Sequence, residues 1–156
     1  MRKQIAILVL LFLASLGLGA YASTFSNETL HYVITYKWGL VQKDAGEATL
    51  SLRTSGSNYV ATLTARTKPW ADKLFQVRDT LRAIMTVREL RPVRYEKIAH
   101  EGGKYSRDII TYSHSGGTAR ATANRTKVRD GKTKRSKKAF STRYEAYDML
   151  SIFYFV

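Results

Sequence analysis

The sequence predicts a mainly β domain, an antiparallel meander followed by a C-terminal helix. Three observations support this class. From Leu30 onward, apolar residues tend to recur at every second position, the period that places them on one face of a strand. Short polar or glycine-containing segments separate these alternating runs, as hairpin turns do. After residue 143 the apolar spacing fits a helix better than a strand.

Alternating runs predict four strands in the first half of the chain. They lie at residues 30–36, 47–53, 59–67 and 77–87. The small polar run at residues 54–58 suits a hairpin turn between the second and third strands. Between the third and fourth strands, Pro69 opens a short helical or looped corner that extends to Phe75.

The second half of the chain continues the same pattern. Further strands are expected around Val93 and Tyr95, at residues 105–114 and at residues 119–128. Gly102-Gly103 permits the positive φ angles of a tight turn, and one more hairpin is expected around Asp130-Gly131. Short turns between successive strands indicate an antiparallel meander, and no internal repeat marks a second domain.

The C-terminal segment is predicted to be a helix. Its apolar residues at helical spacing are Tyr144, Tyr147, Met149, Leu150, Phe153 and Tyr154. The pattern runs to Val156 without a Gly, Asn or basic residue to end the helix. Truncation of the domain at its C-terminus is therefore an open alternative.

Residues 1–22 are predicted to be a cleavable secretory signal peptide. Arg2 and Lys3 precede an apolar stretch at residues 5–18, and Ala20-Tyr21-Ala22 supplies the small residues that signal peptidase requires, so cleavage is expected before Ser23. An uncleaved anchor is the alternative, but the stretch is shorter than the roughly 20 residues that span a bilayer. Residues 23–156 would then form a single β-rich domain, periplasmic or secreted, with no transmembrane span.

The sequence gives little support for catalysis or metal binding. It has no Cys, which excludes disulfides, thiolate metal sites and cysteine nucleophiles. His31, His100 and His114 fall on different predicted strands without metal-binding spacing, and Ser151 has no Gly-x-Ser-x-Gly elbow. We therefore predict no catalytic residue, no metal site and no cofactor, and a protein that is not an enzyme.

Asp79 falls on the predicted apolar stripe of residues 77–87. A buried carboxylate requires a partner. We expect a structural salt bridge to Arg78 or Arg82, or a backbone donor, in preference to a catalytic acid.

Six short segments occur in a characteristic order and spacing. They are Tyr36-Lys37-Trp38-Gly39-Leu40, Ala45-Gly46-Glu47-Ala48, Phe75-Gln76-Val77-Arg78-Asp79, Leu90-Arg91-Pro92-Val93, Glu101-Gly102-Gly103 and Tyr147-Asp148-Met149-Leu150-Ser151. Together they resemble the family of unknown function DUF3108, found in exported proteins of Gram-negative bacteria. The resemblance covers most of the chain after the signal. It implies a curved antiparallel sheet, a partial barrel, packed on the C-terminal helix, and it implies no activity.

The chain is strongly basic, with 26 Lys and Arg against 12 Asp and Glu, and its net charge of +14 would become +12 without the signal. Much of the excess falls in one segment, whose cations are Arg125, Lys127, Arg129, Lys132, Lys134, Arg135, Lys137 and Lys138. Such a hairpin attracts phosphate groups. Because an exported protein rarely meets nucleic acid, an anionic envelope surface is the expected partner. A merely solvated basic loop is the alternative.

Aromatic residues are the candidates for an apolar pocket inside a curved sheet. They are Trp38, Trp70, Phe75, Tyr95, Tyr105 and Tyr112. Ordinary core packing is the alternative for the same residues. We therefore expect a non-enzymatic envelope protein that binds a lipid or anionic envelope component, or else a purely structural or interaction domain of the periplasm.

Overall fold

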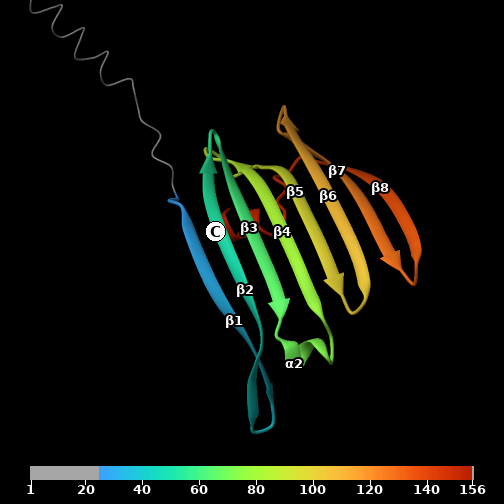
Figure 1. Cartoon of the computed structure of the whole chain (residues 1–156). Coiled ribbons are helices and arrows are strands. Elements are labelled where there is room, and N and C mark those ends of the chain that lie inside the picture. Colours follow the sequence, from blue (N-terminus) through green and yellow to red (C-terminus); the bar gives the residue numbers. More distant parts are fainter. Residues whose placement is uncertain (1–24, 156) are drawn as a thin grey trace, which may run out of the picture.

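A computed structural model describes residues 25–155, apart from the side chains of Trp38 and Val41. Within this range the chain forms one sheet of eight strands in sequence order, and each strand pairs antiparallel with its sequence neighbours (Figure 1). The predicted mainly β class and the meander are therefore confirmed. The predicted signal peptide, residues 1–22, lies outside the described residues.

The elements match the predicted runs closely. The strands are β1 (Glu28–Trp38), β2 (Val41–Ser55), β3 (Asn58–Thr67), β4 (Val77–Thr86), β5 (Pro92–Glu101), β6 (Lys104–Ser115), β7 (Thr118–Arg129) and β8 (Lys132–Thr142). The helices are α2 (Pro69–Asp72) and α3 (Ser151–Phe155). The sheet is open, with β1 and β8 at its two edges, so the partial barrel does not close.

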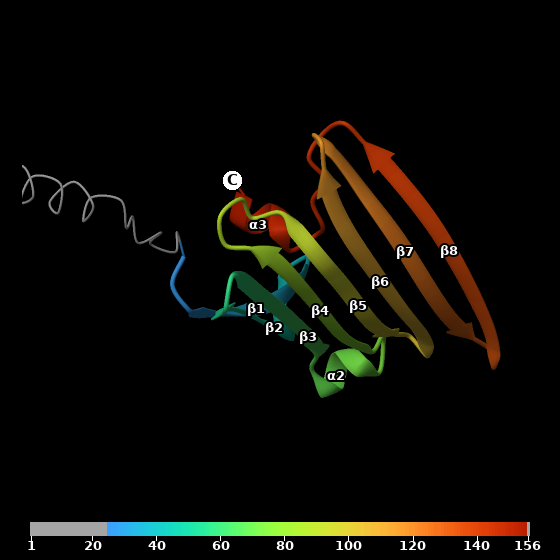
Figure 2. The same ribbon diagram turned by 90° about the horizontal axis from the view of Figure 1, so that it is seen from above.

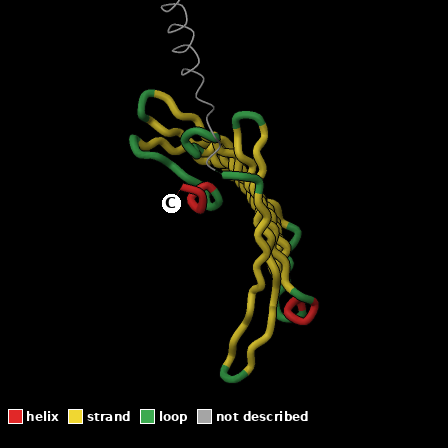
Figure 3. The backbone as a smooth tube through the Cα atoms, turned by 90° about the vertical axis from the view of Figure 1, so that its left-hand side faces the viewer, coloured by secondary structure: helices red, strands yellow, loops and turns green. Residues whose placement is uncertain are grey.

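The C-terminal helix covers one side of the sheet, as Figures 2 and 3 show from above and along the sheet. We call the side that contacts α3 the inner face and the opposite side the outer face. Strand alternation assigns each residue to one of them. Figure 3 also shows that the sheet is curved and that the β1–β2 hairpin extends beyond the other strands.

The hydrophobic core lies between the inner face and the C-terminal segment. Cross-strand neighbours build it layer by layer, because Leu52 pairs with Ala61 and Ala61 with Ala83. The buried residues of this cluster are Leu50, Leu52, Tyr59, Ala61, Leu81, Ala83, Met85, Tyr95, Leu150 and Tyr154. The fully buried strand residues of this cluster therefore come from β2–β5, Ile110 and Tyr112 of β6 pack against them, and the inner face of β6–β8 is left partly uncovered.

The helix α3 is shorter than the apolar spacing predicts, because it begins at Ser151 and not near Tyr144. The Oδ1 of Asp148 accepts hydrogen bonds from the backbone N–H groups of Leu150 (2.9 Å) and Ser151 (3.0 Å). In return, Ser151 Oγ accepts one from the Asp148 N–H at 2.9 Å. This reciprocal capping arrangement fixes the start of the helix. Residues 143–148 therefore cross the inner face as non-helical chain.

A polar cluster fastens the corner between β3 and β4. Arg78 Nη2 binds Asp72 Oδ2 at 2.6 Å, and Thr67 donates a short hydrogen bond to Asp72. The Arg78 hydrogen bond, more than that from Thr67, lowers the pKa of Asp72. The predicted short helix opened by Pro69 is confirmed as α2.

No helix within residues 25–155 has both the length and the apolar character that a membrane crossing requires.

Candidate functional site

The inner face holds a groove where β5–β8 are not covered by α3. Its volume is about 580 Å³, and the segment before α3 forms one wall. Its larger apolar side chains are Tyr95, Ile110, Tyr112, Phe140, Tyr147 and Met149. Its charged side chains are Lys97, Asp108, Arg125, Lys138 and Asp148. The groove therefore combines an apolar wall with a cationic side.

The apolar wall is built from neighbouring strands in register. Tyr95 pairs with Ile110, Ile110 with Ala123, and Tyr112 with Ala121. The small alanines of β7 leave the space that the larger residues surround. The Tyr95 hydroxyl donates to Met149 Sδ at 3.5 Å, which ties the sheet to the segment before α3.

Both tyrosines of this wall stay neutral near pH 7. Burial is the main cause that raises the pKa of Tyr95 to about 12. Burial also raises the pKa of Tyr112, and the Asp148 carboxyl adds to the effect. The wall therefore presents an uncharged aromatic surface to anything in the groove.

The cations of the groove differ in whether they have partners. Arg125 makes two hydrogen bonds to Asp108, Nε–Oδ1 at 2.5 Å and Nη2–Oδ2 at 2.6 Å. Lys97 Nζ lies 3.4 Å from Glu101 Oε1 and 3.7 Å from Asp79 Oδ2. Lys138 forms no ion pair or hydrogen bond with any residue in the described range. Its ammonium group is therefore the cation of the groove that an anionic ligand can reach without displacing a protein carboxylate.

Asp148 supplies a further polar group to the groove. It is buried, and its Oδ2 has no hydrogen-bond partner among residues 25–155. Burial raises the pKa of this carboxyl, although the N–H groups of Ser151 and Leu150 act in the opposite direction. A buried oxygen without a partner is uncommon.

The six predicted aromatic residues do not converge on one pocket. Tyr95 and Tyr112 line the groove. Tyr105 lies on the outer face, where its ring centroid is 4.9 Å from that of His100. Trp38 is the last residue of β1, at the far end of the β1–β2 hairpin from the groove.

Trp70 and Phe75 belong to the α2 corner. Trp70 Nε1 donates to the Asp44 carbonyl at 2.9 Å, and Lys43 Nζ lies 4.6 Å from the centre of its ring. Phe75 packs against the turn at Gly102. Both aromatic side chains therefore stabilise connections between strands outside the groove.

The eight predicted basic residues are divided between the two faces. Strand alternation on both sides of the Asp130-Gly131 turn places on the inner face Arg125, Lys127, Arg129, Lys132, Lys134 and Lys138. It places Arg135 and Lys137 on the outer face. Lys127 stands directly opposite Lys134, and like charges at opposite positions destabilise a strand pair. The inner face of the hairpin tip is thus the more strongly cationic one.

A second hollow extends the groove toward that tip. It has a volume of about 330 Å³, and its lining includes Lys104, Lys127 and Arg129. Positive charge therefore increases along the inner face from the segment before α3 to the end of the hairpin.

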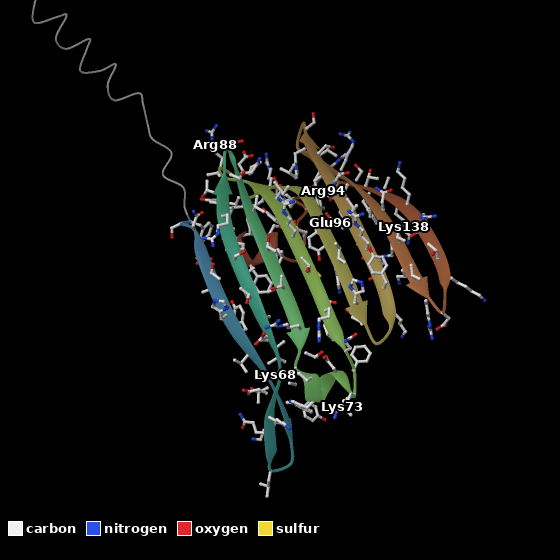
Figure 4. The ribbon with its side chains drawn as sticks, viewed as in Figure 1. Lys68, Lys73, Arg88, Arg94, Glu96 and Lys138 are labelled. Carbon is white, nitrogen blue, oxygen red and sulfur yellow. The ribbon has the colours of Figure 1, made fainter. Side chains whose placement is uncertain are left out.

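The outer face is polar and largely paired. Glu96 accepts from Arg107 Nε at 2.7 Å and lies 3.5 Å from Arg94 Nη2; Figure 4 shows Arg94 and Glu96 as neighbours on β5. Glu47 pairs with Arg66. This face has a hollow of about 430 Å³ around His100, but its walls are mostly threonines and paired ions.

For Asp79 the expected backbone donor is present, because the His100 N–H donates to its carboxyl, but the expected salt bridge forms with a residue other than Arg78 or Arg82. Successive residues of a strand point to opposite faces of the sheet. Arg78 is one residue from Asp79 and Arg82 is three residues from it, so both arginines project to the outer face while Asp79 projects to the inner face. The partner is Lys97 on the neighbouring strand. Asp79 therefore belongs to an ion cluster with Lys97 and Glu101, at the edge of the groove.

The described histidines and acids form no recognisable catalytic constellation. Within residues 25–155, no group of three or more His, Asp or Glu side chains is placed to hold a metal ion. The Ser151 hydroxyl is engaged in the cap of α3. His31 contacts Thr49, and His100 stacks on Tyr105, both on the outer face.

Sequence reasoning missed most of the groove, because only Tyr95, Tyr112, Arg125 and Lys138 among its lining residues were predicted. Lys97, Asp108, Ile110 and Met149 were not among the predicted site residues. The signal was present for the strand residues, because Lys97 is two residues from Tyr95, and Asp108 and Ile110 precede Tyr112 at two-residue spacing. Residues that lie two or four positions from a predicted wall residue on the same strand share its face of the sheet.

The model of one protein family matches residues 31–156, nearly the whole of the described range. That family is described as a protein of unknown function, DUF3108. The chain belongs to the DUF3108 family. Among curated proteins and solved structures, none matches it. The DUF3108 match confirms the resemblance seen in the six segments, one of which, residues 147–151, contains the cap of α3.

Proposed function

We propose that this DUF3108 protein is a non-enzymatic, exported envelope protein that holds an anionic amphiphile, such as a single-chain lipid with a phosphate headgroup, in its inner groove. One observation carries the proposal: the groove joins an uncharged aromatic wall to Lys138, a cation with no partner among the described residues. Ligand sites are commonly apolar clefts with a few polar groups that fix orientation.

The arrangement of the groove supports an amphiphile more than a simple ion. An ion would need only the hairpin tip, where the cations are exposed to solvent and screened by salt. An apolar chain would cover Ile110, Tyr112 and Phe140, which otherwise leave hydrophobic surface open to water. A headgroup next to Lys138 would then lie beside an apolar chain that the groove holds, an arrangement that the hairpin tip does not offer.

The binding test compares two neighbouring lysines. Lys138 lies in the groove, whereas Lys137 projects to the outer face, and neither has a partner in the described range. Titration of lysophosphatidylglycerol into the purified protein, followed by calorimetry, is expected to give saturable binding. Lys138→Ala should weaken it about tenfold, ~1.4 kcal/mol, and Lys137→Ala should leave it nearly unchanged.

Three further ligands test whether binding requires both the apolar chain and the negative charge of the lipid. Zwitterionic lysophosphatidylcholine is expected to bind more weakly, inorganic phosphate weakly, and a short DNA duplex without dependence on Lys138. If lysophosphatidylglycerol does not bind, or if both lysine variants weaken it equally, the groove is not the site and a purely structural domain is the better account.

Export is tested separately from binding. The proposal places the protein in the periplasm or outside the cell, after cleavage between Ala22 and Ser23. Cell fractionation followed by intact mass measurement is expected to give a chain that begins at Ser23. Recovery in the cytosol would contradict export, and a mass that includes Arg2 would contradict cleavage. Either result would leave the binding proposal standing.

A further inference from the structure

The two edges of the sheet differ sharply in charge. Within the described residues, β1 and β8 each pair with a single neighbouring strand. On β8 the charged residues are all cations: Lys132, Lys134, Arg135, Lys137 and Lys138. Basic side chains on an edge strand are a common protection against strand addition. The β8 edge therefore repels a second copy of itself.

The β1 edge lacks that protection. Its only formally charged residues at pH 7 are Glu28 and Lys37, which offset each other. It carries large exposed apolar side chains, with Tyr36 57% and Val33 64% exposed. Leu30, Tyr32 and Ile34 follow the same pattern on the inner face. An edge of this kind is suited to pairing with another strand.

Exposed apolar side chains of α3 lie close to the same edge. Phe25, just before β1, packs edge-on against Tyr154, with ring centroids 5.5 Å apart. The helix therefore sits near the start of β1. Its residues Ile152, Phe153 and Phe155 remain exposed, Phe153 by 69%. A strand added to β1 would lie next to this apolar surface.

We infer that β1 pairs antiparallel with β1 of a second copy of this chain, around a two-fold axis near Tyr32 and Val33. Charge favours this partner and this direction, because antiparallel pairing brings the Glu28 end of each strand to the Lys37 end of the other. Parallel pairing would place like charges together. Pairing of β1 with the β8 of another copy would be head-to-tail, and it would build rings or open chains of molecules and not a two-fold dimer.

Two registers fit the antiparallel arrangement and keep both inner faces on the same side. In one, Tyr32 lies opposite its own counterpart and Leu30 opposite Ile34. In the other, Val33 lies on the axis, so that Tyr32 is opposite Ile34 and Leu30 opposite Tyr36. Both give cross-strand pairs of aromatic and branched aliphatic residues, which stabilise sheets. Either would join the two sheets into one continuous sheet.

The absence of Cys from the chain allows a direct test. Tyr32→Cys and Val33→Cys each introduce a single thiol, and a residue on the two-fold axis lies within disulfide reach of its counterpart. Under mild oxidation, one of the two variants is expected to give a covalent dimer in high yield. Ser136→Cys on the β8 edge is the matched control and should stay mostly monomeric.

Sedimentation equilibrium of the full chain, in the form recovered from the cell, gives the second readout. The mass is expected to rise from monomer to dimer with concentration and to stop there. The double variant Tyr32→Lys with Ile34→Lys should weaken dimerisation at least tenfold, whereas Leu74→Lys, also at an exposed apolar residue, should not. A monomer at every concentration, masses beyond the dimer, or equal cross-linking of Ser136→Cys would overturn the inference.

Discussion

Arg125 on β7 and Asp108 on β6 stand directly opposite each other on the inner face and share two hydrogen bonds, of 2.5 and 2.6 Å. The Asp108 side chain is 17% exposed and that of Arg125 50%. The carboxylate thus holds the guanidinium of Arg125 in a fixed position beside the groove. This pairing leaves Lys138 as the cation that is available to a ligand.

Asp108→Asn should release Arg125 and raise the affinity of the groove for lysophosphatidylglycerol several-fold at low salt. The same change should lower the free energy of unfolding by about 0.5–1 kcal/mol, since a partly exposed ion pair is lost. Calorimetric titration and urea unfolding measure the two effects. Asp130→Asn at the hairpin tip removes the same charge outside the groove, and an equal rise in affinity there would argue against a local effect.

Ser151→Ala should destabilise the protein by about 1–2 kcal/mol. The buried hydroxyl accepts the Asp148 N–H at 2.9 Å, and its removal leaves that donor without a partner. Urea unfolding at constant pH measures the loss. Arg143→Ala, at an exposed residue of the same connection, should stay within about 0.5 kcal/mol of the parent protein.

Asp79 should make stability fall as pH rises. Burial, aided by the neighbouring Glu101 carboxyl, raises the pKa of Asp79 in the folded state. The folded state therefore holds this proton more tightly than the unfolded chain. The contribution of this proton to the free energy of unfolding is complete below the ordinary aspartate pKa of about 4. It is lost as the pH rises through the pKa of Asp79 in the folded state.

Asp79→Asn removes this titration. The stability of Asp79→Asn relative to the parent protein should therefore improve as the pH rises above about 4, until the pH has passed the raised folded-state pKa of Asp79. Urea midpoints measured across that range provide the comparison. A difference between the two proteins that does not change with pH would show that Asp79 titrates alike in the folded and unfolded chains.

Gly102→Ala should cost about 1 kcal/mol more than Gly116→Ala. Both glycines have positive φ, +53° and +57°, so both substitutions carry the strain of the left-handed region. A Cβ at Gly102 would also meet the Phe75 ring, whose Cδ2 is 3.0 Å from the ideal position, whereas Gly116 faces open space. Thermal unfolding of both variants tests this, and adding Phe75→Ala to Gly102→Ala should remove the excess.

The strands could be predicted well because their signal is local. Five of the strands, β1, β2, β5, β6 and β7, end in a turn with Gly, Asn or Asp, and the alternating run and the turn together specify a hairpin without knowledge of distant contacts. The start of α3 could not be found from apolar spacing alone, because the hydrogen bonds between Asp148 and Ser151 determine it. The tyrosines and leucines before that point keep a helical spacing but lie along non-helical chain.

The groove could be predicted only in part. Tyr95 and Tyr112 are recognisable as apolar wall residues, yet their neighbours depend on the register between strands, which a single sequence does not specify. The basic hairpin, by contrast, could be assigned to the two faces of the sheet from the sequence. Its turn at Asp130-Gly131 was recognised, and alternation on both sides of that turn already separates Lys137 from Lys138.

The connection from β8 to α3 sets a limit on how far the sheet can bend. Residues 143–150 lead from one edge of the sheet to a helix seated over β2–β5, and Glu145 anchors their path by binding Arg91 at 2.7 Å. Eight extended residues reach at most about 28 Å. Residues 143–150 therefore limit the distance between the end of β8 and the start of α3. Further opening of the sheet would have to pull Leu150 and Tyr154 out of the hydrophobic core, so this connection limits how wide the inner face can become.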